Sequence, residues 1–205
     1  MITVRKINAI AAAALLCGAL LSPPALADGD AEQGAVLAYT CLGCHGIPGY
    51  RNAYPSYRVP KIGGQKADYI ETALKAYRAG DRQHATMQAN GGPLSDDDIA
   101  DLAAFFQGDE AALDHVTSDM IKDIPAAATC LACHGGGASG LMPTPATLSG
   151  QEESYIVQAL NQYKSGARKN NVMTAFAAGL TDADIAAIAK LWSKQDGVYT
   201  PRAKD

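Results

Sequence analysis

The sequence contains the same pattern twice, and this duplication constrains the fold more than any other feature. Residues of a first copy match residues of a second copy at one fixed offset, 86 positions, as for Gln65 and Gln151 (151 − 65 = 86). The other matched pairs include Gly64 and Gly150, Tyr69 and Tyr155, Leu74 and Leu160, Tyr77 and Tyr163, Gly80 and Gly166, Arg82 and Arg168, Met87 and Met173, Asp98 and Asp184, and Phe106 and Trp192. Because a fixed repeat offset indicates repeated structural units, the sequence predicts two related domains joined between Gly108 and Pro125.

Both copies show the periodicity of amphipathic helices. Apolar residues over 69–77 recur at helical spacing and stop at Gly80, and the second copy repeats this stripe. Another helix is expected after Ser95, and its counterpart after Thr181, because an aspartate follows each of them three residues later, as in a capping box. A further helix is expected over 31–39 of the first copy. Since no stretch alternates with period two, the predicted fold class is all-α.

The N-terminal residues have the pattern of a secretory signal peptide and are set aside from the fold. Arg5 and Lys6 precede an apolar run over 7–21 that is shorter than a membrane-spanning helix of ~20 residues. A small-residue cleavage site ends at Ala27, so the sequence predicts a signal peptide over 1–27 and export to the periplasm. An uncleaved membrane anchor is the alternative. Cleavage would change the formal net charge from −4 to −6 (15 − 21), which is not the charge typical of a nucleic-acid-binding protein.

The motif C-x-x-C-H occurs once in each copy and is the attachment pattern of c-type haem. The two motifs are Cys41-Leu42-Gly43-Cys44-His45 and Cys130-Leu131-Ala132-Cys133-His134. Two thiols at this spacing can bond to the two vinyl groups of one porphyrin, and the adjacent histidine is placed to ligate the iron. A thioredoxin-like pair should lie near a βαβ pattern, which is absent. A zinc site would have to join the two copies, and structural disulfides would leave both histidines unexplained.

A low-spin haem iron needs a second axial ligand, for which Met87 and Met173 are the candidates. Methionine more often fills a core than binds a metal, but the two methionines occupy matching positions in the two copies. His84 competes for the first iron and Met142 for the second, although their counterparts in the other copy are different residue types. Ligation by histidine and methionine would raise the reduction potential. It would also leave neither iron open to a substrate, which favours an electron carrier over an enzyme.

Two arginines in matching positions are candidates for contacts with the haem propionates. Arg82 and Arg168 each follow the glycine that ends a predicted helix, and the planar guanidinium suits carboxylates. A solvated arginine at a helix end is the alternative for each.

In this order, the motifs resemble those of the cytochrome c4 family, whose members are two-domain, two-haem class I cytochromes c. The order is C-x-x-C-H-G, Gly-Gln, a tyrosine-rich helix, G-x-R, an axial methionine and a Leu-Ser-Asp-Asp-Asp-Ile helix. The resemblance implies tandem class I domains over 28–112 and 113–205, each wrapped around one covalently bound haem c group. The ligand pairs that it implies are His45 with Met87 and His134 with Met173.

The resemblance also implies a function and a set of partners. Members of the family carry electrons, typically from a quinol-oxidising cytochrome complex toward a terminal oxidase. Redox partner proteins are therefore expected as donor and acceptor, and the protein would reach a membrane surface through them. An electron-accepting subunit of a periplasmic dehydrogenase is the second interpretation. A two-haem peroxidase is the third, and it would require one iron to lose its methionine.

Two departures from the family pattern predict unequal environments for the two haems. A P-x-L-x-G stretch in class I cytochromes supplies a carbonyl that orients the ligating histidine. Residues 60–64 read P-K-I-G-G, whereas residues 146–150 read A-T-L-S-G, with Pro145 one place early. The helix before the second motif also has little room between Pro125 and Cys130. We therefore expect two distinguishable reduction potentials.

Overall fold

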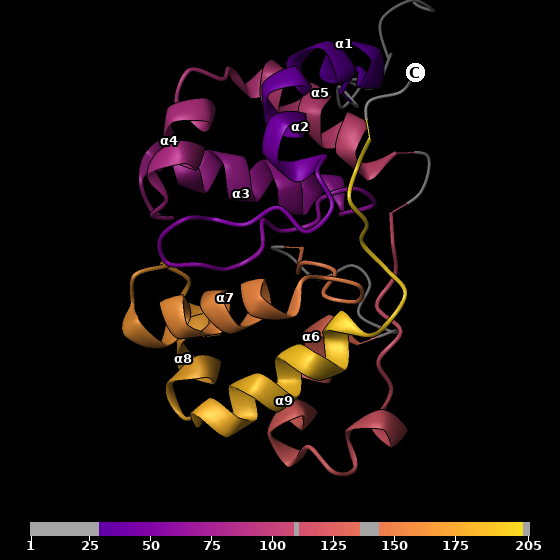
Figure 1. The fold of residues 1–205 in the computed structure, drawn as a ribbon, viewed down its shortest axis with the longest axis vertical. Coiled ribbons are helices and arrows are strands. Elements are labelled where there is room, and N and C mark those ends of the chain that lie inside the picture. The colour runs from indigo at the N-terminus through magenta and orange to yellow at the C-terminus, as the bar shows by residue number, and fades with distance from the viewer. Residues whose placement is uncertain (1–28, 109–110, 136–143, 203–205) are drawn as a thin grey trace, which may run out of the picture.

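The structure is a computed structural model that describes residues 29–108, 111–135 and 144–202. The predicted signal peptide and Met142 lie outside the described residues. Within the described ranges the regular elements are helices, and the only strand-like pairings are isolated β-bridges. The all-α prediction is therefore confirmed. Figure 1 shows the helices of the first copy stacked on those of the second.

The first copy folds into five helices around one small core. They are α1 (Ala31–Leu37), α2 (Tyr39–His45), α3 (Ala67–Ala79), α4 (Ala85–Gly91) and α5 (Asp96–Gln107). Both α1 and α3 pack against α5, whose buried face includes Ile99, Leu102 and Phe106. The helix expected over 31–39 is present as α1, and after Ala38 the chain continues directly into α2, which contains the first C-x-x-C-H motif.

Local signals in the sequence set the ends of these helices. Gly80 ends α3 in a left-handed conformation with φ of 80°, a conformation that glycine adopts without strain. At the start of α5, the Ser95 hydroxyl accepts a hydrogen bond of 3.0 Å from the amide of Asp98, whose carboxylate accepts one of 2.8 Å from the amide of Ser95. Thr181 and Asp184 form the same capping box. Both predicted capping boxes are confirmed.

The second copy repeats this arrangement with a shorter beginning. Its elements are the 3₁₀ helices η1 (Ser118–Ile121) and η2 (Pro125–Cys130), followed by α6 (Leu131–His134), α7 (Glu153–Ser165), α8 (Asn171–Ala178) and α9 (Asp182–Ser193). Trp192 of α9 is fully buried in a core that includes Ile156 and Ile188. As expected, no long helix precedes the second motif among the described residues, and η2 takes its place.

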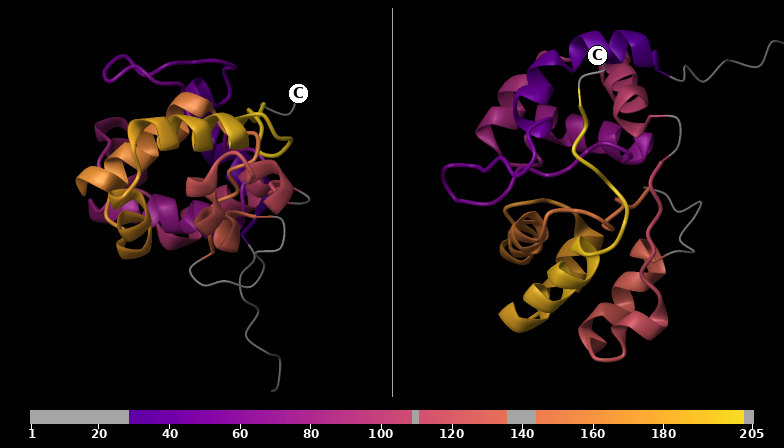
Figure 2. Two further views of the ribbon diagram at one scale, coloured as in Figure 1. Left: turned by 90° about the horizontal axis from the view of Figure 1, so that it is seen from below. Right: turned by 45° about the vertical axis from the view of Figure 1, so that its right-hand side comes forward.

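A C-terminal tail, residues 197–202, leaves the second copy and returns to the first, as the yellow segment in Figures 1 and 2 shows. Tyr199 and Gly63 exchange two backbone hydrogen bonds of 3.0 and 2.9 Å. The Tyr199 ring covers Gly63 so closely that a Cβ atom at Gly63 would lie 2.5 Å from it. The tail of the second copy thus covers part of the first. The domain boundary between residues 112 and 113 stays a prediction.

Among the residues that the structure describes, no single helix is long and apolar enough to cross a membrane. Residues 171–177 together with α9 reach that length and composition only as a pair bent by 116°.

Candidate haem sites

The two C-x-x-C-H motifs offer unpaired thiols. None of the four cysteines, Cys41, Cys44, Cys130 and Cys133, forms a disulfide. Burial raises the pKa of the Cys41 and Cys130 thiols. No group of three or more histidine, cysteine or acidic side chains converges within the described ranges. The disulfides and the shared zinc site considered from the sequence are therefore not formed in this part of the chain.

Both motif histidines are oriented by a backbone carbonyl. Nδ1 of His45 lies 2.8 Å from the Pro60 carbonyl oxygen, and Nδ1 of His134 lies 2.8 Å from that of Ala146. Because a carbonyl only accepts, Nδ1 is the protonated donor, and Nε2 is left as the nitrogen for iron. Burial is the main cause that lowers the pKa of both histidines, which favours the neutral form that binds metals. Two unpaired thiols beside such a histidine fit a c-type haem in each copy.

The orienting hydrogen bond is the same in both copies, although the sequence departs from P-x-L-x-G in the second. The two sites differ instead in a hydrogen bond to the backbone carbonyl of the motif histidine. Trp192 donates a hydrogen bond of 3.2 Å from its indole Nε1 to the backbone carbonyl of His134. Phe106, the matching residue of the first copy, has no such donor. This asymmetry supports the expectation that the two haems have different reduction potentials.

The two candidate methionine ligands lie on matching short helices, Met87 on α4 and Met173 on α8. Met173 packs against the same core cluster as Cys130 of the haem motif, whereas the core cluster of the first copy does not include Met87. Ligation of iron by these two methionines stays a prediction.

His84, the competing ligand, has a structural role at the start of α4. Its Nδ1 accepts a hydrogen bond of 3.3 Å from the amide of Met87, and its Nε2 lies 3.0 Å from Nδ2 of Asn52. In the second copy, the side-chain oxygen of Asn170 accepts the matching bond from Met173, at 2.9 Å. Nδ1 of His84 is thus engaged by the backbone, and His84 and Asn170 are equivalent helix caps.

The matched arginines meet where the two copies join. The backbones of Arg82 and Arg168 form an antiparallel bridge, and each side chain is only 7% exposed, so the solvated alternative is wrong. Each guanidinium bonds to a tyrosine of the other copy: Arg82 to the Tyr155 hydroxyl, and Arg168 to the Tyr69 hydroxyl at 2.8 Å. Neither arginine forms an ion pair with a carboxylate of the described residues.

Each guanidinium also lies over an aromatic ring of its own copy. Arg82 is 4.4 Å from the centre of the Tyr77 ring, and Arg168 is 4.5 Å from that of Tyr163. Cation–π contacts of this kind hold a buried cation in place without neutralising it. Two buried positive charges without a protein carboxylate fit a site for acidic groups such as haem propionates, and that contact stays a prediction.

The arginines give one tyrosine an unusual acidity. Burial raises the pKa of Tyr69, but the charges of Arg168 and Arg82 outweigh burial and bring this pKa to about 8. We expect one tyrosinate to appear in an ultraviolet difference titration near pH 8. Between this value and about 10, the pKa of an unfolded tyrosine, the unfolded chain binds one more proton, so the ionisation makes the free energy of unfolding increase with pH.

The control for this titration is Arg168→Leu, in which the tyrosinate should appear only at higher pH, whereas Tyr69→Phe should remove it altogether. A wild-type protein without a tyrosinate below pH 9 would contradict the prediction.

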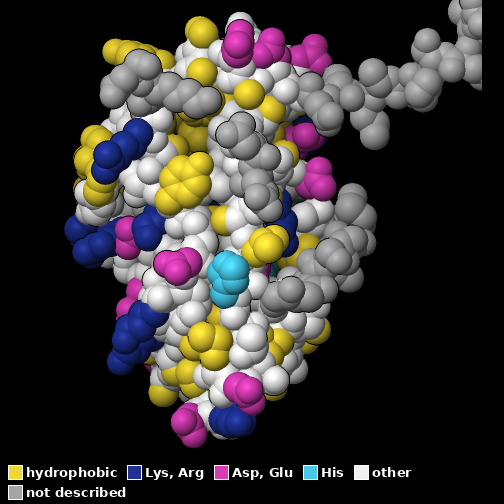
Figure 3. Space-filling view, turned by 90° about the vertical axis from the view of Figure 1, so that its right-hand side faces the viewer, with side chains coloured by type: hydrophobic (Ala, Val, Ile, Leu, Met, Phe, Trp, Pro, Cys, Tyr) yellow, Lys and Arg dark blue, Asp and Glu magenta, His cyan; other side chains and the backbone are white. Residues whose placement is uncertain are grey.

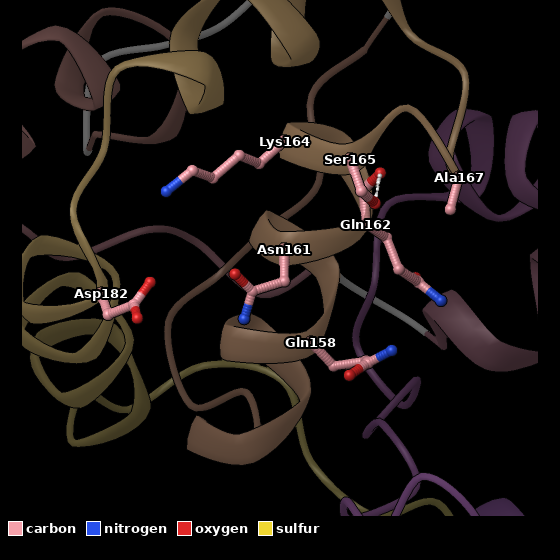
Figure 4. Close-up of a pocket in the computed structure, with 7 residues that line it drawn as sticks. All are labelled: Gln158, Asn161, Gln162, Lys164, Ser165, Ala167 and Asp182. Atoms are coloured by element: carbon pink, nitrogen blue, oxygen red, sulfur yellow. Dashed lines mark hydrogen bonds between the residues drawn. The ribbon is translucent and has the colours of Figure 1, made fainter.

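A surface hollow near α7 is separate from the residues of the haem sites. It is lined by Gln158, Asn161, Gln162, Lys164, Ser165, Ala167 and Asp182. Figure 4 shows that these side chains project from α7, from the turn after it at Ala167 and from the start of α9, with the Ser165 hydroxyl bonded to the Gln162 carbonyl of the same helix. Six of the seven lining residues are polar or charged, and none of them is a candidate haem ligand.

Comparison with known proteins assigns both copies to cytochromes c. Residues 31–108 match the family described as Cytochrome c, and residues 123–191 match the family described as Cytochrome C oxidase, cbb3-type, subunit III. A cytochrome c4 of Azotobacter vinelandii is 30% identical over 190 residues, which cover 80% of this chain and 88% of the relative. A thiosulfate dehydrogenase electron acceptor of Thiomonas intermedia (strain K12) is 29% identical over 180 residues, which cover 77% of this chain and 79% of the relative.

A solved structure agrees with these relatives. The crystal structure of reduced recombinant cytochrome c4 from Pseudomonas stutzeri matches with a TM-score of 0.65 and 26% identity, over 82% of this chain and all (100%) of that chain. Two C-x-x-C-H motifs in two cytochrome c domains account for two covalent haem c groups. The chain therefore belongs to the cytochrome c4 family of dihaem cytochromes.

Proposed function

We propose that this protein is a periplasmic electron carrier that accepts electrons from a quinol-oxidising complex and delivers them to a terminal oxidase. The observation that carries the proposal is the duplicated haem site: in each copy, a C-x-x-C-H motif lies beside a carbonyl that fixes Nδ1 of its histidine at 2.8 Å. Relatives of matching length include cytochromes c4 and an electron acceptor of a dehydrogenase.

The residues of each copy bind, orient and shield one haem, which supplies one-electron redox chemistry when bound. The ligands that we propose are His45 with Met87 and His134 with Met173, and the cysteines hold the porphyrin covalently. With both histidine and methionine as ligands, the iron would have no position open to substrates such as oxygen or peroxide. The same ligands would hold the iron in both redox states, so little rearrangement would accompany electron transfer. This arrangement suits a carrier rather than an enzyme.

The proposed partners are redox proteins rather than nucleic acids. The formal net charge is −4, and Figure 3 shows acidic and basic side chains on one face, with most of the basic ones along its left edge. On this face the basic side chains are interspersed with acidic ones, unlike the continuous basic patch that nucleic-acid backbones require. Such a mixed face is compatible with short-lived electrostatic encounters between proteins.

The test of the proposed function is the ferric spectrum of the purified protein combined with a stepwise redox titration. A carrier should show the sulfur-to-iron charge-transfer band, no high-spin signal, and two one-electron steps at distinguishable potentials. Intact mass should correspond to two haems and to cleavage after Ala27. A high-spin signal would overturn the carrier assignment for the haem concerned. One reduction potential shared by both haems would contradict the difference expected from the Trp192 hydrogen bond.

A permanent subunit of a periplasmic dehydrogenase is the second candidate function, which the similarity to a thiosulfate dehydrogenase electron acceptor favours. The two functions use the same haems and differ in the lifetime of the complex with the donor. A free carrier should elute alone when extracted from its native membranes at moderate salt. Co-elution with a dehydrogenase at a fixed ratio would support the subunit instead.

A further inference from the structure

Two buried glutamines cross between the copies at equivalent positions. Gln65 is 3% exposed and Gln151 is 5% exposed. The Gln65 side chain donates from Nε2 to the Thr147 carbonyl at 3.0 Å, and its Oε1 accepts from the Thr147 amide at 2.9 Å. Gln151 forms the same pair of bonds with Lys61, both at 2.8 Å. Each glutamine thus binds one backbone residue of the other copy at two points.

The bound amides belong to the peptide groups that orient the haem ligands. The carbonyl of Pro60 and the amide of Lys61 are the two ends of one peptide group, so the group accepts from His45 on one side and donates to Gln151 on the other. In a trans peptide these two ends point in opposite directions. The group therefore links the histidine of the first copy to a glutamine of the second.

The second copy has the mirror arrangement. The carbonyl of Ala146 accepts from Nδ1 of His134, and the amide of the same peptide group, on Thr147, donates to Oε1 of Gln65. Thr147 is fully buried, so water does not compete for this bond. Each histidine is linked through one peptide group to a glutamine from the opposite copy.

Hydrogen bonds at the two ends of one peptide group strengthen each other. An acceptor at the amide polarises the group and makes its carbonyl oxygen a better acceptor. A stronger acceptor at Nδ1 makes the imidazole a more basic iron ligand, and a more basic ligand stabilises ferric over ferrous iron. Each glutamine therefore lowers the reduction potential of the haem in the opposite copy.

We propose that Gln65 and Gln151 are positioning residues that act across the junction: Gln65 adjusts the haem bound by His134, and Gln151 adjusts the haem bound by His45. The proposal rests on haem ligation by these two histidines, as the proposed function requires. Its consequence is that docking of the two copies sets the potential of both haems. A copy separated from its neighbour would lose this adjustment.

The test uses the full-length holoprotein with four single substitutions. Gln65→Leu and Gln151→Leu remove the cross-junction bonds, and Gln65→Glu keeps an acceptor oxygen in the same place. Gln107→Leu is the matched control, because Gln107 accepts a backbone hydrogen bond of 2.9 Å from Ala67 within the first copy and makes no such link. Each haem is assigned by NMR through its thioether bonds to the cysteines of its own motif. The potentials then follow from a titration.

We expect Gln65→Leu to raise the potential of the haem attached to Cys130 and Cys133. The change should be about threefold in the equilibrium constant for reduction, or about 28 mV at 59 mV per tenfold for one electron. The haem of its own copy should move less. Gln151→Leu should instead raise the potential of the haem attached to Cys41 and Cys44. Gln65→Glu should not raise either potential, and Gln107→Leu should leave both unchanged.

Several results would overturn the proposal: a larger shift in the glutamine's own copy, equal shifts of both haems, or no shift in either leucine variant. Thermal unfolding of each variant, followed by circular dichroism, identifies a variant that fails to fold. In that case the reduction potentials of Gln65→Glu are compared with those of the wild-type protein. A wild-type protein without the sulfur-to-iron band would refute the proposed ligand set instead. The crossed pattern of shifts can still be measured in that case, so the two failures are distinguishable.

Discussion

Replacing Met173 with alanine is expected to remove about half of the sulfur-to-iron charge-transfer absorption of the ferric protein, because we propose methionine–histidine ligation for both haems. Alanine has no thioether, so one face of the second iron becomes open to water and that haem becomes high-spin. Its reduction potential should fall, since the thioether stabilises ferrous iron. Absorption spectra, electron paramagnetic resonance and a redox titration measure these changes.

The remaining methionines provide the controls for this experiment. Met87→Ala should remove the other half of the absorption, and the double variant should remove all of it. Met120→Ala should change nothing, because Met120 is 42% exposed on η1. Full absorption in Met173→Ala would exclude Met173 as a ligand. His84 is not expected to substitute in Met87→Ala while its ring caps α4.

Replacing Trp192 with alanine is expected to lower the free energy of unfolding by about 3–5 kcal/mol, as for other large-to-small core substitutions. The side chain is 0% exposed and lies in the core of the second copy. The substitution leaves a cavity beneath η2 and α6, and it removes the indole hydrogen bond to the backbone of His134. Denaturant unfolding of the holoprotein, followed by circular dichroism, measures the loss.

Trp192→Phe separates the two contributions. Phenylalanine keeps most of the buried area and matches Phe106 of the first copy, so the loss should be about 1 kcal/mol, the usual value for one hydrogen bond. It should also bring the two reduction potentials closer together, because the donor to the His134 carbonyl is what distinguishes the second site. An equal loss of stability in Trp192→Ala and Trp192→Phe would contradict the cavity argument.

The sequence predicts the parts of this fold that depend on near neighbours. Helix ends such as Gly80 and the Ser95 capping box are specified within a few residues. The C-x-x-C-H motifs are likewise local, so the amino-acid sequence alone identifies the thiols and the proximal histidine. The 86-residue offset extends these assignments from one copy to the other.

Contacts between the copies could not be predicted, because they depend on which faces meet. Gln65 and Gln151 are visible in the sequence only as a matched pair, with no sign that each binds the opposite backbone. The arginines suit solvent and haem equally by residue type, yet their protein partners are tyrosines of the other copy. His84 is a candidate ligand because its type suits iron, whereas its position before Met87 makes it a helix cap. A buried glutamine beside a glycine, repeated in register, is the signal that would have indicated a shared role.

The C-terminal tail makes the order of chain synthesis relevant to the first copy. The first C-x-x-C-H motif is synthesised before residues 197–202, because the chain is made from its N-terminus. The two backbone hydrogen bonds between Tyr199 and Gly63 can form only when the second copy has been made. Until then, residues 60–64, whose Pro60 carbonyl accepts the hydrogen bond from His45, lack this contact.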